Sequence, residues 1–160
     1  RIAGCRKIIA VGRQQAKLDV ALEVGATDIV NTRETDPVEA VRAITGGEGT
    51  TFALDTTGVA SVIKQAINAS SIYATICTVA MSPDTLNVEI EQELMGPGRT
   101  IMGSTEGDAV AKTFIPLMVD YYKQGRFPFD KLCEFYDWKD IDQAFQDSLD
   151  GKVVKPILVM

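Results

Sequence analysis

Histidine is absent from the 160-residue sequence. Its absence removes the commonest general base at neutral pH, the base of Ser-His and Cys-His nucleophile pairs, and the most frequent metal ligand. Cysteine is scarce, since only Cys5, Cys77 and Cys133 occur, far apart and without a CxxC pair. This spacing indicates neither a structural zinc site nor a disulfide framework. We interpret the thiols as buried or idle in a reducing compartment, and we expect a cytoplasmic protein.

Long hydrophobic runs and an excess of positive charge are also missing. No apolar run approaches the ~20 residues that a membrane helix needs, and the N-terminus lacks a signal-peptide pattern, so we expect no membrane partner. The net charge of -6 and the pI of about 4.7 argue against nucleic acid as a partner. The sequence begins without methionine, in a stretch typical of the middle of a domain, which favours a fragment of a longer chain.

Apolar runs alternate with helical patterns over the first two thirds of the sequence. Runs typical of strands covered on both faces lie at 7–11, 28–31, 52–56, 73–79 and 100–103. Helices are predicted between the earlier runs, at 14–24, after Asp36-Pro37, and after a cap at Ser61. The alternating Glu89, Glu91 and Glu93 are interpreted as a solvated face. This order predicts an α/β fold, a Rossmann-type doubly wound parallel sheet.

The pattern changes after Gly103, where we place the boundary between a partial dinucleotide-binding domain (1–103) and a C-terminal α+β segment (104–160). Residues 108–124 are predicted to be helical, with Pro116 kinking or splitting the helix. The aromatic stretch FPFDKLCEFYDW is predicted to be irregular. Asp140 and Gln143 are predicted to form a capping box for the last helix, before a final strand at 153–160.

The end of the first apolar run is the first candidate site. In a doubly wound fold, ligands bind beyond the carboxyl ends of the strands, and the second strand ends near the adenosine ribose of a dinucleotide. A carboxylate commonly holds that ribose, whereas this sequence has Gly12 and Arg13, with Lys17 one helical turn later. An arginine can bind a 2′-phosphate with two hydrogen bonds, which favours NADP. The alternative is a strand-ending glycine beside solvated basic residues.

Small residues follow the later strands. Thr56 and Thr57, in the stretch LDTTG, are placed to line a cofactor cleft. The small residues that end the next strand would let a flat ring approach the backbone; they are Thr78, Val79 and Ala80. Ordinary strand-end packing is the alternative for all of these. A catalytic role for Asp55 competes with a structural pairing, which is more common for a carboxylate inside an apolar strand.

Neither glycine-rich stretch of the sequence fits a phosphate-binding loop. Such a loop follows a strand and opens a helix, whereas GGEG at 46–49 precedes a strand and GPG at 96–98 is typical of a turn. We therefore expect the first strand of the sheet and its glycine-rich loop to lie before Arg1.

Four stretches occur in order along the chain: VGRQQAKLDVALEVGATDIVN, FALDTTG, TIMGSTEGD and DIDQAFQDSLDGKVVKPILV. Together they resemble the zinc-type medium-chain alcohol dehydrogenase family over nearly all 160 residues. Within that family, they are most similar to the aryl- or benzyl-alcohol dehydrogenases. The resemblance implies a C-terminal fragment of an enzyme that transfers hydride between an alcohol, aromatic in that branch, and NAD(P). The zinc ligands would lie in a preceding catalytic domain, to which residues 104–160 return. The whole enzyme would be a homo-oligomer, a dimer or tetramer, and the fragment itself inactive.

The resemblance also implies which residues contact the nicotinamide cofactor. Gly12 replaces the frequent ribose-binding aspartate, which with Arg13 leans towards NADP over NAD, and Lys17 matches a ribose-contacting lysine. The other implied contacts are a turn lining the cofactor (Thr56, Thr57, Gly58), the carboxamide-binding segment (Thr78, Val79, Ala80), two nicotinamide neighbours on the strand at the dimer axis (Thr100, Met102) and a pyrophosphate contact (Lys155). No catalytic residue and no metal ligand is implied within this chain.

Two other functions stay open from the sequence. One is a non-catalytic Rossmann-like module that binds a nucleotide or serves in assembly, because a fold alone does not fix a function. The other is a zinc-free relative of the quinone-reductase type, which shares the same cofactor half.

Overall fold

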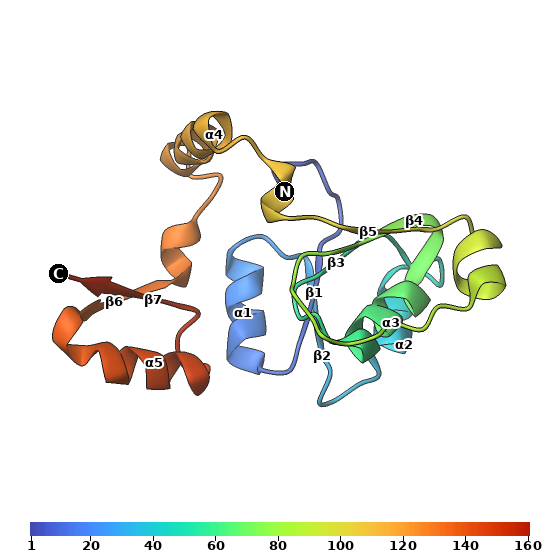
Figure 1. Ribbon diagram of the computed structural model, residues 1–160, viewed down its shortest axis with the longest axis horizontal. Helices are drawn as coiled ribbons and strands as arrows, with labels where there is room; N and C mark the ends of the chain where they lie inside the picture. Colours follow the sequence, from blue (N-terminus) through green and yellow to red (C-terminus); the bar gives the residue numbers. More distant parts are fainter. The chain divides into compact units, whose positions relative to one another are not determined.

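The computed structural model describes all 160 residues, which form two compact units of alternating strands and helices (Figure 1). The first unit contains Arg1–Arg33 and Ala111–Met160, and the second contains Glu34–Val110. Every strand pairing is parallel, which confirms the predicted α/β class with parallel sheets. The predicted boundary between residues 103 and 104 stays a prediction.

The first unit opens with a strand–helix–strand motif composed of β1 (Ile9–Gly12), α1 (Gln15–Glu23) and β2 (Asp28–Asn31). The two strands pair in parallel, so that Gly12 at the end of β1 lies opposite Asn31 at the end of β2. Leu18 on α1 and Val30 on β2 are buried. These elements confirm the strands and the helix predicted from the apolar pattern.

The rest of the first unit contains α4 (Ala111–Lys123), a 3₁₀ turn (Phe129–Leu132), β6 (Cys133–Asp137), a second 3₁₀ turn (Trp138–Asp140), α5 (Ile141–Leu149) and β7 (Lys155–Val159). Pro116 lies inside α4, which continues as one helix, so the predicted split does not occur. The stretch predicted to be irregular contains β6, which pairs in parallel with β7. A partner strand so far along the chain is invisible to a local pattern.

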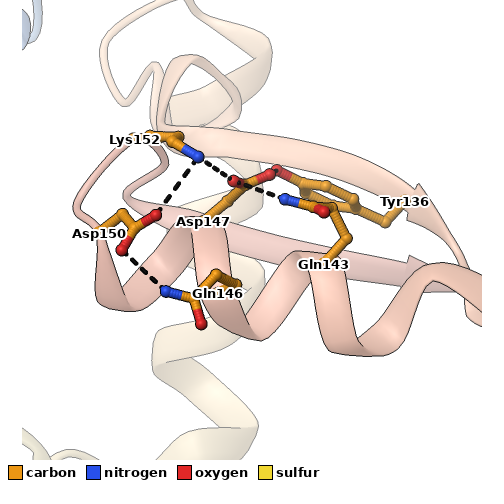
Figure 2. A network of polar contacts seen from close by, with 6 residues as sticks. All are labelled: Tyr136, Gln143, Gln146, Asp147, Asp150 and Lys152. Carbon is orange, nitrogen blue, oxygen red and sulfur yellow. Dashed lines mark hydrogen bonds and ion pairs between the residues drawn. The ribbon is translucent and has the colours of Figure 1, made fainter.

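A polar network joins α5 to β6 and to the loop before β7 (Figure 2). Asp147 accepts hydrogen bonds from Tyr136 Oη at 3.2 Å and from Gln143 Nε2 at 2.9 Å, and it pairs with Lys152 at 2.9 Å. The contact with Lys152 holds the pKa of the Asp147 carboxyl below its usual value. The predicted capping box is wrong, because the Asp140 side chain makes no cap bond and Gln143 is engaged by Asp147 instead.

The second unit contains α2 (Pro37–Ile44), β3 (Thr50–Asp55), α3 (Ala60–Asn68), β4 (Ser70–Thr78), a π-helical turn (Ile90–Met95), β5 (Thr100–Gly103) and a 3₁₀ turn (Glu106–Asp108). Its three strands pair in the order β3-β4-β5. Asp36 caps α2 as predicted, accepting two backbone N–H bonds at 2.9 Å. Ser61 does not cap α3, which begins at Ala60; the Ala60 N–H instead donates to Asp84 at 3.2 Å.

The core of the second unit lies on one face of its sheet. Ile67 of α3 packs with Ala74 and Ile76 of β4, and all three are fully buried. Because side chains alternate along a strand, Phe52 and Leu54 of β3 point to the opposite face, where they are 72% and 66% exposed. Within these 160 residues, this unit therefore buries its sheet on one side only.

The glutamates interpreted as a solvated face are only partly so. Glu93 is 8% exposed, pairs with Lys64 of α3 and accepts a hydrogen bond from the Glu89 N–H at 2.8 Å. The bond from Lys64 is the main reason that the pKa of the Glu93 carboxyl lies below its ordinary value. The prediction was wrong for Glu93 because the lysine that covers it comes from a distant part of the chain.

The strand order bears on the predicted absence of a first strand. In a doubly wound sheet of order 3-2-1-4-5-6, the first strand lies between the second and the fourth. Removing it leaves a pair of strands and a set of three, which is the pairing found for β1-β2 and β3-β4-β5.

The one-sided core predicts unequal effects of truncation on the two faces. Ile76→Ala is expected to lower the free energy of unfolding by about 2–5 kcal/mol, because it opens a cavity in the buried face. Leu54→Ala, on the neighbouring strand but the wet face, is expected to change it by less than about 0.5 kcal/mol. Urea unfolding of both variants tests this, and equal losses would contradict the burial of a single face.

Candidate functional site

The carboxyl end of β3 is built around the carboxylate of Asp55, which is only 3% exposed. Its Oδ1 accepts hydrogen bonds from the Thr57 N–H at 3.1 Å and from the Thr57 hydroxyl at 2.7 Å. Its Oδ2 accepts a bond from the Gly58 N–H at 3.0 Å. The chain therefore turns tightly around this carboxylate as it leaves the strand.

The same carboxylate reaches across to β4. Thr78, which pairs with Asp55 in the parallel register, donates its hydroxyl to Oδ2 at 3.0 Å, and the Val79 N–H donates to the Asp55 carbonyl at 3.0 Å. Burial raises the pKa of Asp55, but the hydrogen bonds from Thr57, Gly58 and Thr78 together bring it below the ordinary value. Asp55 is thus an ionised carboxylate with a structural role, which is more common than the catalytic role considered as its alternative.

Gly58 occupies a position that only glycine fits. Its φ is +68°, in the left-handed region, and a Cβ added there would lie 2.8 Å from the Met81 carbonyl oxygen. Such a separation is shorter than van der Waals contact, and backbone cannot yield as a flexible side chain does. The turn after β3 is therefore packed directly against the segment that follows β4.

A pocket of about 240 Å³ opens at these strand ends. Gly58 and Ala60 line it after β3, Thr78 and Ala80 line it at the end of β4, and Ile76 and Ile101 give it an apolar floor. The segment after β4 closes one side with Ser82, Asp84 and Leu86. Sequence reasoning missed this segment, although Ser82-Pro83-Asp84 is a turn signal that could have directed attention to it.

The two predicted nicotinamide neighbours on β5 differ in position. Met102 pairs with Cys77 near the carboxyl end of the strands, on the face opposite the pocket-lining Ile101. Thr100 pairs with Thr75 at the start of β5, away from the end that carries the pocket. The structure therefore groups the predicted turn 56–58 with the segment 78–80, and it does not bring Thr100 to them.

The remaining predicted residues belong to the first unit. Gly12 ends β1, Arg13 follows it with an exposed side chain, and Lys17 is exposed in the first turn of α1. β2 ends in Asn31, so neither strand of this sheet ends in a carboxylate. Arg13 and Lys17 therefore follow the end of β1, which has no acidic residue that would repel a phosphate. Lys155 is the exposed first residue of β7.

Comparisons with known proteins agree on the family. Residues 1–120 match the family model described as zinc-binding dehydrogenase. A geraniol dehydrogenase from Castellaniella defragrans is 35% identical over 161 residues, which cover 99% of this chain and 43% of that protein. Its sequence therefore extends well beyond the part that this chain matches.

Solved structures share the fold. The benzyl alcohol dehydrogenase from Acinetobacter calcoaceticus matches with a TM-score of 0.93 and 38% identity, over 98% of this chain and 43% of its own. An alcohol dehydrogenase zinc-binding domain protein from Burkholderia ambifaria matches with a TM-score of 0.95 and 43% identity, over 100% of this chain and 43% of its own. These likenesses confirm the predicted Rossmann-type fold, and the chain spans 43% of the length of each of these relatives.

The contact between Gly58 and the segment after β4 can be tested with a matched pair of glycines. Gly107 has a φ of +71°, close to that of Gly58, but a Cβ there would meet nothing within 4 Å. Gly107→Ala is expected to cost about 1 kcal/mol for the left-handed backbone alone. Gly58→Ala is expected to cost about 2 kcal/mol more, because of the clash with the Met81 carbonyl. Urea unfolding measures both, and equal costs would show that no close approach exists.

Proposed function

The chain belongs to the zinc-binding dehydrogenase family, and we propose that it forms the NAD(P)-binding part of an alcohol dehydrogenase. The names of two relatives, a geraniol and a benzyl alcohol dehydrogenase, support an alcohol and its aldehyde as the reactants of the whole protein. The observation that carries the proposal is the pocket at the carboxyl ends of β3 and β4. This edge is where doubly wound sheets bind nucleotides.

The strand ends of the second unit suit a flat cofactor ring. The pocket combines an apolar floor with few polar groups, as small-molecule sites commonly do. No side chain larger than valine occurs at 78–80, so a ring can approach the backbone there. The proposal assigns the following residues to the cofactor: Thr56, Thr57, Gly58, Thr78, Val79 and Ala80. Thr100, Met102 and Lys155 are assigned to it on the family resemblance alone.

The first unit supports NADP over NAD. Arg13 and Lys17 are both exposed beside the end of β1, and Gly12 leaves no carboxylate at that strand end. A guanidinium matches the geometry of a phosphate with paired hydrogen bonds, whereas an aspartate there would favour the free ribose hydroxyls of NAD. We therefore propose that these three residues bind the 2′-phosphate of NADP.

The contribution of this chain to the reaction is binding and alignment. When bound, the nicotinamide supplies the redox chemistry of alcohol oxidation and a zinc ion supplies Lewis acidity. Within these 160 residues, no group of three or more His, Cys, Asp or Glu side chains is placed to hold a metal ion. The proposal therefore assigns zinc to the part of the whole protein outside this chain.

We also propose that the whole protein is a cytoplasmic homo-oligomer, a dimer or tetramer. β5 pairs only with β4, which leaves its second edge available for another strand. The family resemblance assigns that edge to the dimer axis. No helix of the chain is long and apolar enough to cross a membrane.

The cofactor preference is tested by Gly12→Asp in the whole protein. A Cβ at Gly12 would lie 3.3 Å from Leu18 Cδ2, so a small shift of that side chain accommodates it. The change is expected to lower the ratio of kcat/KM for NADP to that for NAD by roughly ten-fold or more, because a carboxylate repels the 2′-phosphate. Steady-state kinetics with both cofactors measure the ratio.

Gly12→Asn is the matched control, since it has the same shape without the charge. It is expected to leave most of the NADP preference in place. An unchanged ratio in Gly12→Asp would refute the assignment of the 2′-phosphate to this strand end. An equal fall in both variants would show that shape, not charge, controls the ratio.

The 160-residue chain by itself is expected to give no zinc-dependent alcohol oxidation. It contains no histidine, and its three cysteines stand far apart, so it has no evident means of holding a catalytic zinc. The measurement is NAD(P)H formation from benzyl alcohol or geraniol, with added zinc and then with a chelator. Turnover that the chelator abolishes would refute the proposal that the catalytic zinc is held by a part of the whole protein outside this chain.

A further inference from the structure

We propose that Asp55 is the positioning residue that holds the strand ends of the second unit in the shape that receives the nicotinamide end of the cofactor. The inference rests on the proposed function and adds a residue to which neither the family resemblance nor the comparisons assign a role. Asp55 itself is not a ligand contact, because it is 3% exposed. It acts through the residues that surround its carboxylate.

Four donors from two separate segments converge on this one carboxylate. Three come from the turn after β3, namely the Thr57 N–H, the Thr57 hydroxyl and the Gly58 N–H. The fourth is the hydroxyl of Thr78 at the end of β4. Each oxygen thus accepts two hydrogen bonds, and this one side chain links the two segments assigned to the cofactor, beside the backbone bond from the Val79 N–H to the Asp55 carbonyl.

This arrangement also sets what the neighbouring hydroxyls can do. Thr57 donates its only hydroxyl proton to Asp55 and accepts the Val59 N–H at 3.1 Å, so its hydroxyl is used within the turn. Thr78 likewise donates its proton to Asp55 and retains only acceptor capacity towards a ligand. Thr56, which lies between Asp55 and Thr57 in the chain, is exposed to solvent at the strand end.

A carboxylate is required because every partner is a donor. An asparagine at position 55 has the same shape but replaces one oxygen by an NH₂ group, which cannot accept. Whichever way the amide is turned, one backbone N–H loses its acceptor, either the part-buried one of Thr57 or the buried one of Gly58. The turn is then expected to spend most of its time in other shapes, and the cofactor binds the remaining competent fraction.

The test is Asp55→Asn in the whole protein, with two ligands titrated by fluorescence or calorimetry. NADPH probes both ends of the site, and adenosine 2′,5′-bisphosphate probes only the end assigned to Arg13 and Lys17. The Kd for NADPH is expected to rise roughly ten-fold, which corresponds to about one molecule in ten holding the turn after β3 in its binding shape. The Kd for the bisphosphate is expected to stay within about two-fold. If the enzyme prefers NADH, the pair is NADH and AMP.

Two further variants separate positioning from simple loss of stability. Asp36→Ala removes another carboxylate that accepts two backbone N–H bonds, at the start of α2 and outside the pocket. It is expected to lower Tm without moving either Kd. Thr78→Val, which removes the link to β4, is expected to raise the Kd for NADPH, and Thr78→Ser is expected to restore it.

The outcomes distinguish this inference from the function on which it rests. If the unaltered protein binds NADPH and Asp55→Asn binds it equally well, the positioning role is overturned and the proposed function stands. Equal rises for NADPH and the bisphosphate would also overturn it, because the effect would then be global. If the unaltered protein binds neither NADPH nor NADH, the proposed function fails and the inference fails with it.

Discussion

A single buried carboxylate organises the candidate site of the second unit. Asp55 ends β3, and its four hydrogen bonds define both the turn that follows and the link to β4. The left-handed backbone of Gly58 and its close approach to the Met81 carbonyl are consequences of that turn. The pocket exists where the two segments meet. Without an ionised acceptor at this point, the turn after β3 would lose its side-chain link to β4, and the backbone bond from Val79 and the contact of Gly58 with Met81 would remain.

The first unit also has a strand followed by a helix, but the charges at the end of its first strand are exposed. β1 also ends at a small residue beside a helix, but its neighbours Arg13 and Lys17 are cations in contact with water. In the second unit, the Asp55 carboxylate is buried and bonded within the protein. In the first unit, the charges of Arg13 and Lys17 are exposed and available to a ligand. This contrast underlies the different cofactor contacts proposed for the two units, a phosphate contact for exposed cations and a ring contact for small neutral residues.

Local signals predicted local structure well. The apolar runs located the strands of the parallel sheets, and Asp36-Pro37 gave a correct helix start because the cap and its N–H partners lie within one turn. The errors occurred where a distant partner decides the outcome. Asp84 serves the start of α3 in place of Ser61, Lys64 buries Glu93, and β6 forms because β7 lies beside it. For the site, spacing located the strand ends, but the link that Asp55 makes between them depends on the fold, because Thr78 lies 23 residues further along the chain.

The wet face of the second sheet has a thermodynamic consequence. Parallel strands are ordinarily covered on both sides, yet Phe52 and Leu54 remain largely exposed in this 160-residue chain, which spans 43% of the length of its geraniol dehydrogenase relative. The heat-capacity increment of unfolding and the denaturant m-value both scale with the surface newly exposed, so this unit should give small values of each for its length. A calorimetric trace would therefore be broad, with a shallow stability curve that is less sensitive to temperature than that of a domain covered on both sides.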